Sequence, residues 1–131
     1  MIENQLIKYI KAKRPILYIN HYDYKEIDSM IISAIKDIEN LKIYEYRSIG
    51  EVDFVNKKIL EDEAQNLFQF IKNHYVEGMF EKVFLILKDV DDELENPKVL
   101  AMLRKISEMT VYNQEYNLTI IIVSQKIQVP I

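Results

Sequence analysis

The chain has 131 residues, of which 49% are hydrophobic and 29% charged, and its formal net charge is −4 at pH 7. This length and composition fit a single globular domain with an apolar core. The absence of cysteine excludes disulfides, thiolate catalysis and zinc–thiolate sites, and it favours a cytoplasmic location. No apolar run approaches the length of a membrane span, and the negative charge argues against a nucleic-acid-binding domain.

The first third of the chain predicts alternating helices and strands. Residues 2–11 carry apolar side chains at helical spacing, and residues 15–20 form a short apolar run typical of a strand. Asp23, with Glu26 three positions later, predicts the N-cap of a helix. The apolar face of that helix comprises Ile27, Met30, Ile31, Ala34, Ile35 and Ile38. Residues 41–48 favour a second strand, near a sheet edge.

The middle of the chain gives a weaker pattern. Residues 51–60 are ambiguous, and after a turn at Gly50 their apolar side chains could form a small hairpin arm, with Val52, Phe54 and Val55 as its members. Asp62 begins a second cap signature, which predicts a helix that Gly78 ends.

The last third contains the two most apolar segments. Residues 83–87 are five consecutive apolar residues, which predicts a strand buried on both faces within residues 82–87. Asn96 and Pro97 predict the start of a helix, and residues 118–124 predict a fourth, buried strand. Because helices and strands alternate with short connections, we expect a mostly parallel sheet of about four main strands between two layers of helices.

Acidic residues follow the third strand directly. Asp89, Asp91 and Asp92 would lie at the carboxyl end of the sheet, where a nucleotide-binding fold holds Mg²⁺. Two plainer interpretations compete with a metal site. The acids can be solvated or cap the next helix, with Asp92 as a turn residue, and Lys88 can form an internal ion pair with Asp89 that removes the need for a metal.

Two of these segments carry a resemblance to a known family. KVFLILKDVDD at residues 82–92, followed one helix later by LTIIIVSQ, resembles the Walker B strand and the sensor strand of RecA-like AAA ATPases. With YIKAKRPILYIN, the NPKVLAMLRKI helix and IIIVSQKIQVP included, the whole chain resembles the degenerate N-terminal domain of certain bacterial and chloroplast AAA ATPases. In that family the domain precedes a cell-division-protease-like ATPase module.

The resemblance implies a three-layer αβα, RecA-like (P-loop NTPase-like) fold. Residues 1–131 would form one degenerate, truncated domain at the N-terminus of a larger AAA ATPase. The following ATPase module would be a partner of the domain, and ATP and Mg²⁺ would be cofactors of the parent protein, not of this fragment. The parent would be an ATPase and the fragment itself not an enzyme.

The chain departs from the family's nucleotide-binding pattern. After the first strand it reads NHYDYKEIDS, which lacks the glycines and the Gly-Lys-Ser/Thr of a phosphate-binding loop, so we expect no functional loop. Asp23 would repel a phosphate. Asp89 matches the Walker B aspartate, but Val90 stands where the water-activating glutamate belongs, and Gln125 falls near the sensor position. We therefore predict no catalytic or cofactor-binding residue, with Asp89 and Asp92 as the remaining candidates for a metal.

Two functions follow from these residues. The first is a non-catalytic interaction or regulatory domain of an AAA ATPase, recruiting an unknown protein partner. The alternative is a Mg²⁺-dependent phosphoryl-transfer or receiver-like switch domain that uses the acids after the third strand. A receiver-like site needs acids at the end of the first strand, where this chain has Asn20 and His21.

The family resemblance also predicts the strand order two-three-four-one. The first strand would then lie at a sheet edge, where a fifth strand of the parent protein would pair with it. Residues 16–19 are apolar, so in this fragment we expect self-association through that edge, or its coverage by the N-terminal helix.

Overall fold

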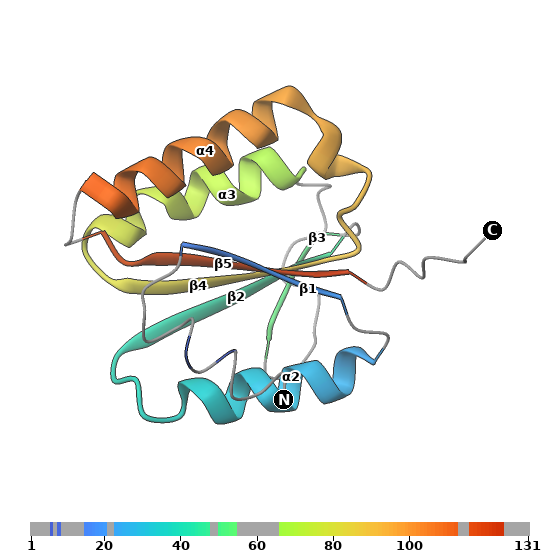
Figure 1. The fold of residues 1–131 in the computed structure, drawn as a ribbon, viewed down its shortest axis with the longest axis vertical. Coiled ribbons are helices and arrows are strands. Elements are labelled where there is room, and N and C mark those ends of the chain that lie inside the picture. The colour runs from blue at the N-terminus through green and yellow to red at the C-terminus, as the bar shows by residue number, and fades with distance from the viewer. Residues whose placement is uncertain are drawn as a thin grey trace.

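The computed structural model describes residues 6, 8, 15–20, 23–47, 50–54, 66–112 and 116–124. Within these residues one five-stranded sheet has the order β1-β5-β4-β2-β3 (Figure 1). Its strands are β1 (Ile16–Asn20), β2 (Leu41–Arg47), β3 (Gly50–Val52), β4 (Lys82–Lys88) and β5 (Leu118–Ser124). All neighbouring strands pair in parallel except β3, which runs antiparallel to β2.

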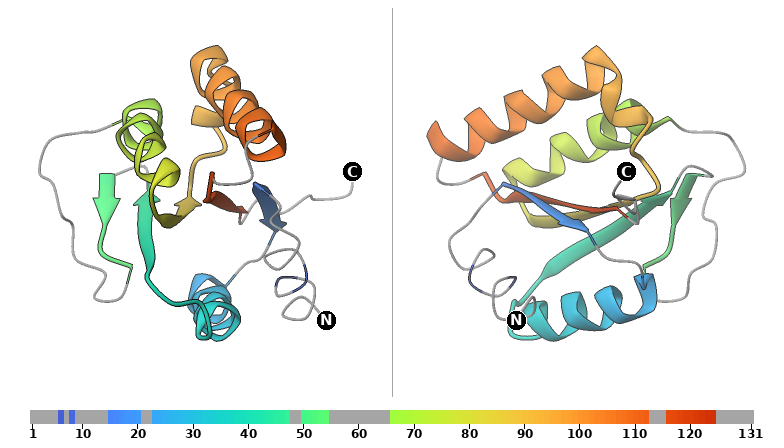
Figure 2. Two further views of the ribbon diagram at one scale, coloured as in Figure 1. Left: turned by 90° about the vertical axis from the view of Figure 1, so that its left-hand side faces the viewer. Right: turned by 45° about the vertical axis from the view of Figure 1, so that its right-hand side comes forward.

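This order confirms the predicted arrangement of the four main strands. β1 lies at one edge and the short β3 at the other (Figure 2). β3 corresponds to the hairpin arm that the sequence allowed, although it begins at Gly50 itself. Val52 in β3 and Phe54 just beyond it are buried. Val55 lies outside the described residues.

Helices cover both faces of the sheet. α2 (Tyr24–Ile35) lies on one face, and α3 (Leu67–Tyr75) and α4 (Pro97–Tyr112) lie on the other (Figures 1 and 2). Two short 3₁₀ helices, η1 (Glu77–Met79) and η2 (Glu93–Glu95), precede β4 and α4. The predicted three-layer, RecA-like fold is confirmed. None of the helices described is long and apolar enough to cross a membrane.

β4 is the centre of both cores. Its side chains alternate between the two faces, since Val83, Leu85 and Leu87 pack in the cluster below α3 and α4. Phe84 and Ile86 pack in the cluster between the sheet and α2. The uninterrupted apolar run therefore predicted a strand buried on both faces correctly, because each face of a parallel sheet needs its own apolar side chains.

The sequence also predicted α2 and its start. The Asp23 carboxylate accepts hydrogen bonds from the backbone N–H groups of Lys25 and Glu26, which caps the helix. Ile27 and Ile31 are fully buried against the sheet. Of the predicted helix at residues 2–11, the structure describes Leu6 and Lys8, both in helical conformation.

The predicted ends of α3 were wrong. Its N-cap is Asn66, whose side chain accepts from the N–H of Gln69 at 2.8 Å, whereas the predicted cap Asp62 lies outside the described residues. The helix ends at Tyr75, before Gly78, which lies in η1. Glycine is required at position 78 because a Cβ atom there would lie 2.8 Å from the Cβ of Leu118. Close packing, not a helix stop, explains this residue.

α4 begins as predicted. The Asn96 side chain accepts from the N–H of Lys98 at 2.9 Å, and Pro97 is the first helical residue. The acidic loop and η2 lie between the end of β4 and the start of α4. They are therefore at the carboxyl end of the sheet, where the parallel strands β1 and β5 also end.

Candidate functional site

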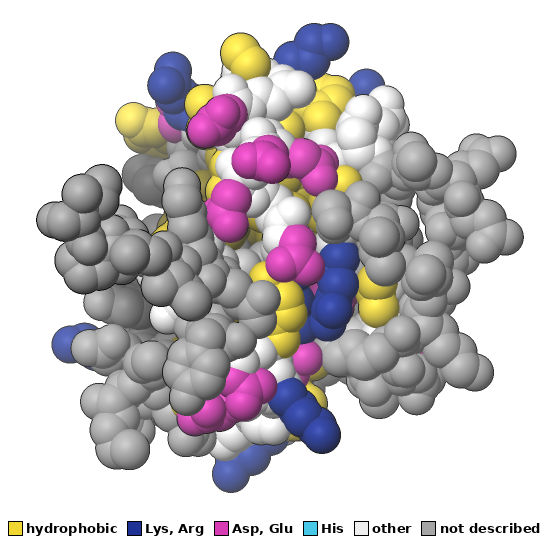
Figure 3. All heavy atoms as spheres, turned by 90° about the vertical axis from the view of Figure 1, so that its right-hand side faces the viewer, with side chains coloured by type: hydrophobic (Ala, Val, Ile, Leu, Met, Phe, Trp, Pro, Cys, Tyr) yellow, Lys and Arg dark blue, Asp and Glu magenta, His cyan; other side chains and the backbone are white. Residues whose placement is uncertain are grey.

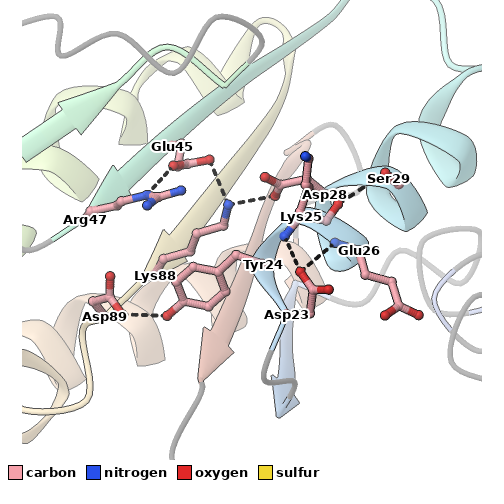
Figure 4. Close-up of polar contacts among 10 residues, drawn as sticks. All are labelled: Asp23, Tyr24, Lys25, Glu26, Asp28, Ser29, Glu45, Arg47, Lys88 and Asp89. Carbon is pink, nitrogen blue, oxygen red and sulfur yellow. Dashed lines mark hydrogen bonds and ion pairs between the residues drawn. The ribbon is translucent and has the colours of Figure 1, made fainter.

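A fully buried lysine connects α2 to the carboxyl end of the sheet. Lys88, the last residue of β4, has an exposed fraction of 0%. Its Nζ lies 2.7 Å from Oδ1 of Asp28 in α2 and 3.0 Å from Oε1 of Glu45 in β2 (Figure 4). The other carboxylate oxygen of Glu45 accepts from Nε of Arg47 at 2.7 Å. We call Asp28, Glu45, Arg47 and Lys88 the Lys88 cluster.

Strand geometry explains why these side chains meet. Lys88 follows Phe84 and Ile86 on the α2 face of β4, because alternate residues of a strand share a face. Glu45 lies on the same face of the adjacent β2 and is paired with Ile86. Asp28 is next to the buried Ile27, on the side of α2 that faces the sheet. All three side chains therefore point into the space between α2 and the sheet.

The formal charges of the Lys88 cluster sum to zero. Each of its two cations contacts a carboxylate, in the order Asp28, Lys88, Glu45, Arg47. Burying an isolated charge costs several kcal/mol, and partners within hydrogen-bonding distance offset that cost. Glu45 is as completely buried as Lys88, and Asp28 is nearly so. Two aromatic rings complete the surroundings, since Nζ of Lys88 is 5.1 Å from the ring centre of Tyr24 and 6.0 Å from that of Phe54.

Tyr24, the first residue of α2, connects the cluster to the acidic loop. Its hydroxyl donates to Oδ1 of Asp89 at 2.6 Å, and its ring lies 5.5 Å from the Arg47 guanidinium carbon (Figure 4). Burial, together with the hydrogen bond to Asp89 and the negative charge of that carboxylate, raises the pKa of the Tyr24 hydroxyl above its usual range. The hydroxyl therefore remains a proton donor to Asp89 across the physiological pH range.

The predicted ion pair between Lys88 and Asp89 was wrong. Lys88 points between the sheet and α2, where Asp28 and Glu45 hold its ammonium group. Asp89 takes a left-handed backbone conformation with φ of 57°, and its exposed carboxylate reaches Tyr24. Asp tolerates this conformation better than most residues, which fits its position immediately after the strand.

The other acids of the loop have separate partners. Asp91 accepts from the Ser124 hydroxyl at 3.1 Å and from the Tyr18 hydroxyl at 3.5 Å. Glu93 accepts from the Tyr46 hydroxyl at 2.9 Å and from the N–H of Leu67 at 3.0 Å. Asp92 is exposed and its side chain makes no capping hydrogen bond to η2. It lies in a turn, as one of the alternative interpretations of the sequence predicted.

Acidic side chains run along the face at the carboxyl end of the sheet (Figure 3). Across the residues that the structure describes, no group of three or more His, Cys, Asp or Glu side chains could hold a metal ion. A metal site at Asp89 and Asp92 stays a prediction. The sensor-like Gln125 lies outside the described residues, as do His21 and Tyr22. Val90 is buried in the core beneath α3 and α4.

Sequence reasoning missed the Lys88 cluster, although the chain contains a signal for it. Asp28 interrupts the apolar face of a helix, Glu45 lies between two tyrosines of a strand, and Lys88 ends an apolar run. Each is a charge at a position where the periodicity predicts burial. Three such residues on elements that pack together indicate a buried ion-pair network.

We expect Lys88→Met to lower the free energy of unfolding by about 3–5 kcal/mol, because two buried carboxylates then lose the cation between them. Urea denaturation measures the change. The control is Lys82→Met at the exposed start of the same strand, for which we expect a change within about 0.5 kcal/mol.

Adding Asp28→Asn to Lys88→Met should recover a large part of the loss, since Glu45 keeps Arg47 as a partner. If Lys88→Met costs no more than Lys82→Met, the cluster does not stabilise the fold.

Comparison with known proteins identifies a family for this chain. No curated protein matches the chain. Residues 2–131 match the family described as the SpoVK-like AAA ATPase, N-terminal domain. The match covers almost the whole chain. The chain therefore belongs to the family of SpoVK-like AAA ATPase N-terminal domains.

Proposed function

We propose that this chain is a non-catalytic interaction or regulatory domain of an AAA ATPase whose own nucleotide site has been lost. The observation that carries the proposal is the 2.6 Å hydrogen bond between Tyr24 and Asp89. It joins the start of α2 directly to the Walker B position. In a nucleotide-binding P-loop fold, these two elements are bridged by Mg²⁺ and phosphate.

A carboxylate of the protein itself, that of Asp23, binds the N-terminus of α2. A phosphate-binding loop offers free backbone N–H groups at a helix N-terminus. Here the Asp23 carboxylate accepts from the N–H groups of Lys25 and Glu26 at 3.0 and 3.3 Å (Figure 4). A phosphate would have to displace a covalently tethered carboxylate and then lie beside its charge. Both effects oppose nucleotide binding.

A side chain of the protein also occupies the position where Mg²⁺ would lie beside Asp89. In P-loop NTPases a Ser or Thr hydroxyl at the start of the helix and the Walker B aspartate hold Mg²⁺ between them. The Tyr24 hydroxyl instead contacts Asp89 directly, which leaves no space for an ion between the two atoms. Val90, where a glutamate would activate water, is an apolar core residue.

ATP and Mg²⁺ chemistry would then belong to the AAA module that follows this domain in the parent protein. The fragment would serve that module in the cytoplasm, by binding a protein partner or by packing against the module. The competing switch function would need carboxylates at the end of β1, where the structure has an exposed Asn20.

Calorimetry with Mg-ATP at high-micromolar concentration tests the loss of the site. We expect no saturable heat, because the helix N-terminus and the Walker B position are both occupied by side chains of the protein. A titration with MgCl₂ alone is the control. Saturable heat that Asp89→Ala abolishes would show that the site still works.

Thermal and urea unfolding of Asp89→Ala test the role of this residue. We expect the free energy of unfolding to fall by about 0.5–2 kcal/mol through loss of the Tyr24 hydrogen bond. Tyr24→Phe should reproduce most of that loss, and the exposed Asp92→Ala should change stability by less than about 0.5 kcal/mol. A melting temperature that rises with Mg²⁺ in the wild type, but not in Asp89→Ala, would favour the switch function.

A further inference from the structure

α3 and α4 form the outer layer on one face of the sheet, and none of the described helices or strands covers their outer sides (Figures 1 and 2). The two helices run in the same direction. At the start of α3, the Leu67 N–H donates to Glu93 in η2, just before α4. At its end, the carbonyl of Tyr75 accepts from the hydroxyl of Tyr116, which follows α4. One edge of α3 therefore lies alongside one edge of α4.

Four partly buried apolar side chains occupy these facing edges. Phe68 and Tyr75 are seven positions apart in α3, and Met102 and Met109 are seven positions apart in α4. Seven residues make about two helical turns, so each pair lies on one side of its helix. Nζ of Lys105 lies 5.3 Å from the ring centre of Tyr75. Because positions 102, 105 and 109 share one helix face, this contact shows that the two methionines lie on the α3 side of α4.

The charged side chains along these edges are lysines. Lys72 lies over Phe68, with its Nζ 6.0 Å from the ring centre, as Lys105 lies over Tyr75. Lys98, seven positions before Lys105, falls on the same side of α4. All three lysines are exposed, and none of the ion pairs between described residues involves them. The α3–α4 surface is the name we give to Phe68, Lys72, Tyr75, Met102, Lys105 and Met109.

This surface is basic, although the chain has a net charge of −4. Four of the five exposed charged side chains of α3 and α4 are cations, the five being Lys72, Lys98, Arg104, Lys105 and Glu108. The carboxyl end of the sheet is acidic instead (Figure 3). Cations that lie beside apolar side chains, without carboxylates of their own, favour a partner that supplies the carboxylates.

We propose that the α3–α4 surface binds an amphipathic helix of a partner protein, whose apolar stripe is flanked by acidic residues. The apolar stripe would cover the two aromatic rings and the two methionines, and the carboxylates would pair with Lys72 and Lys105. This inference specifies the partner of the proposed interaction domain and so rests on that proposed function.

The seven-residue spacing favours a helix as the partner. Apolar side chains at positions i and i+7 of a helix recur at about 10.5 Å, which is the interval of the apolar pairs in α3 and α4. Methionine side chains adapt to the shape of a helix that packs on them. A nucleic acid would be repelled by the net charge of the chain and would not need the apolar side chains.

Three designed peptides, each about three heptads long, test the chemistry of the partner. The first has leucine at positions a and d and glutamate at e and g. The second has lysine in place of each glutamate, and the third has alanine in place of each leucine. We expect fluorescence anisotropy to show saturable binding of the first peptide. The other two should bind at least about tenfold more weakly, because one repels the lysines and the other lacks the apolar stripe.

Methionine methyl signals in NMR spectra locate the contact on the wild-type protein. The first peptide should shift the signals of Met102 and Met109. The signal of Met30, which packs in the cluster on the α2 face of the sheet, should stay unchanged and serves as the internal control.

Charge reversal tests the role of the lysines. The double variant Lys72→Glu/Lys105→Glu should raise the dissociation constant of the first peptide by at least about tenfold. The matched control, Lys36→Glu/Lys82→Glu, makes the same change in net charge at two exposed lysines away from this surface, and it should leave the constant unchanged.

A lack of saturable binding of the first peptide would overturn the inference, and so would equal weakening by the control pair. Shifts at Met102 and Met109 that are larger with single-stranded RNA or with phosphatidylserine vesicles than with the peptide would likewise contradict a protein helix as the partner. The calorimetry with Mg-ATP tests the loss of the nucleotide site separately, so the two proposals can fail independently.

Discussion

The ion pairs of the buried Lys88 determine how α2 lies on the sheet. Lys88 bonds to α2 through Asp28 and to β2 through Glu45, so one ammonium group connects three elements. A buried cation cannot leave these carboxylates without a large desolvation cost, which makes the arrangement of the three elements specific. Asp28 is four residues after Tyr24, about one helical turn, so holding Asp28 also fixes the start of α2.

That constraint positions the residues that close the carboxyl end of the sheet. With the start of α2 fixed, the Tyr24 hydroxyl meets Asp89, and Asp23 caps the helix with its own carboxylate. The Tyr24 ring also lies beside the cations of Lys88 and Arg47. In our proposal, intramolecular contacts of this kind replace those that a nucleotide and its metal ion make in an active P-loop fold. The fold would then be kept for binding other proteins.

Much of this fold follows from local patterns in the sequence. The apolar runs of β4 and β5 and the caps Asp23 and Asn96 act through neighbouring residues, so the sequence alone predicted them. The Lys88 cluster was not predicted, because its partners lie 60 and 43 positions away and their meeting depends on the strand order. The role of Gly78 likewise depends on Leu118, which only the folded sheet brings near.

The most direct test of a closed nucleotide site follows the backbone amide signals of Lys25 and Glu26 by NMR during a titration with Mg-ATP. Both N–H groups donate to Asp23, so we expect their chemical shifts to stay unchanged up to millimolar nucleotide. Saturable shifts at these two amides, accompanied by a shift at Asp89, would contradict a site that is closed by the protein's own side chains.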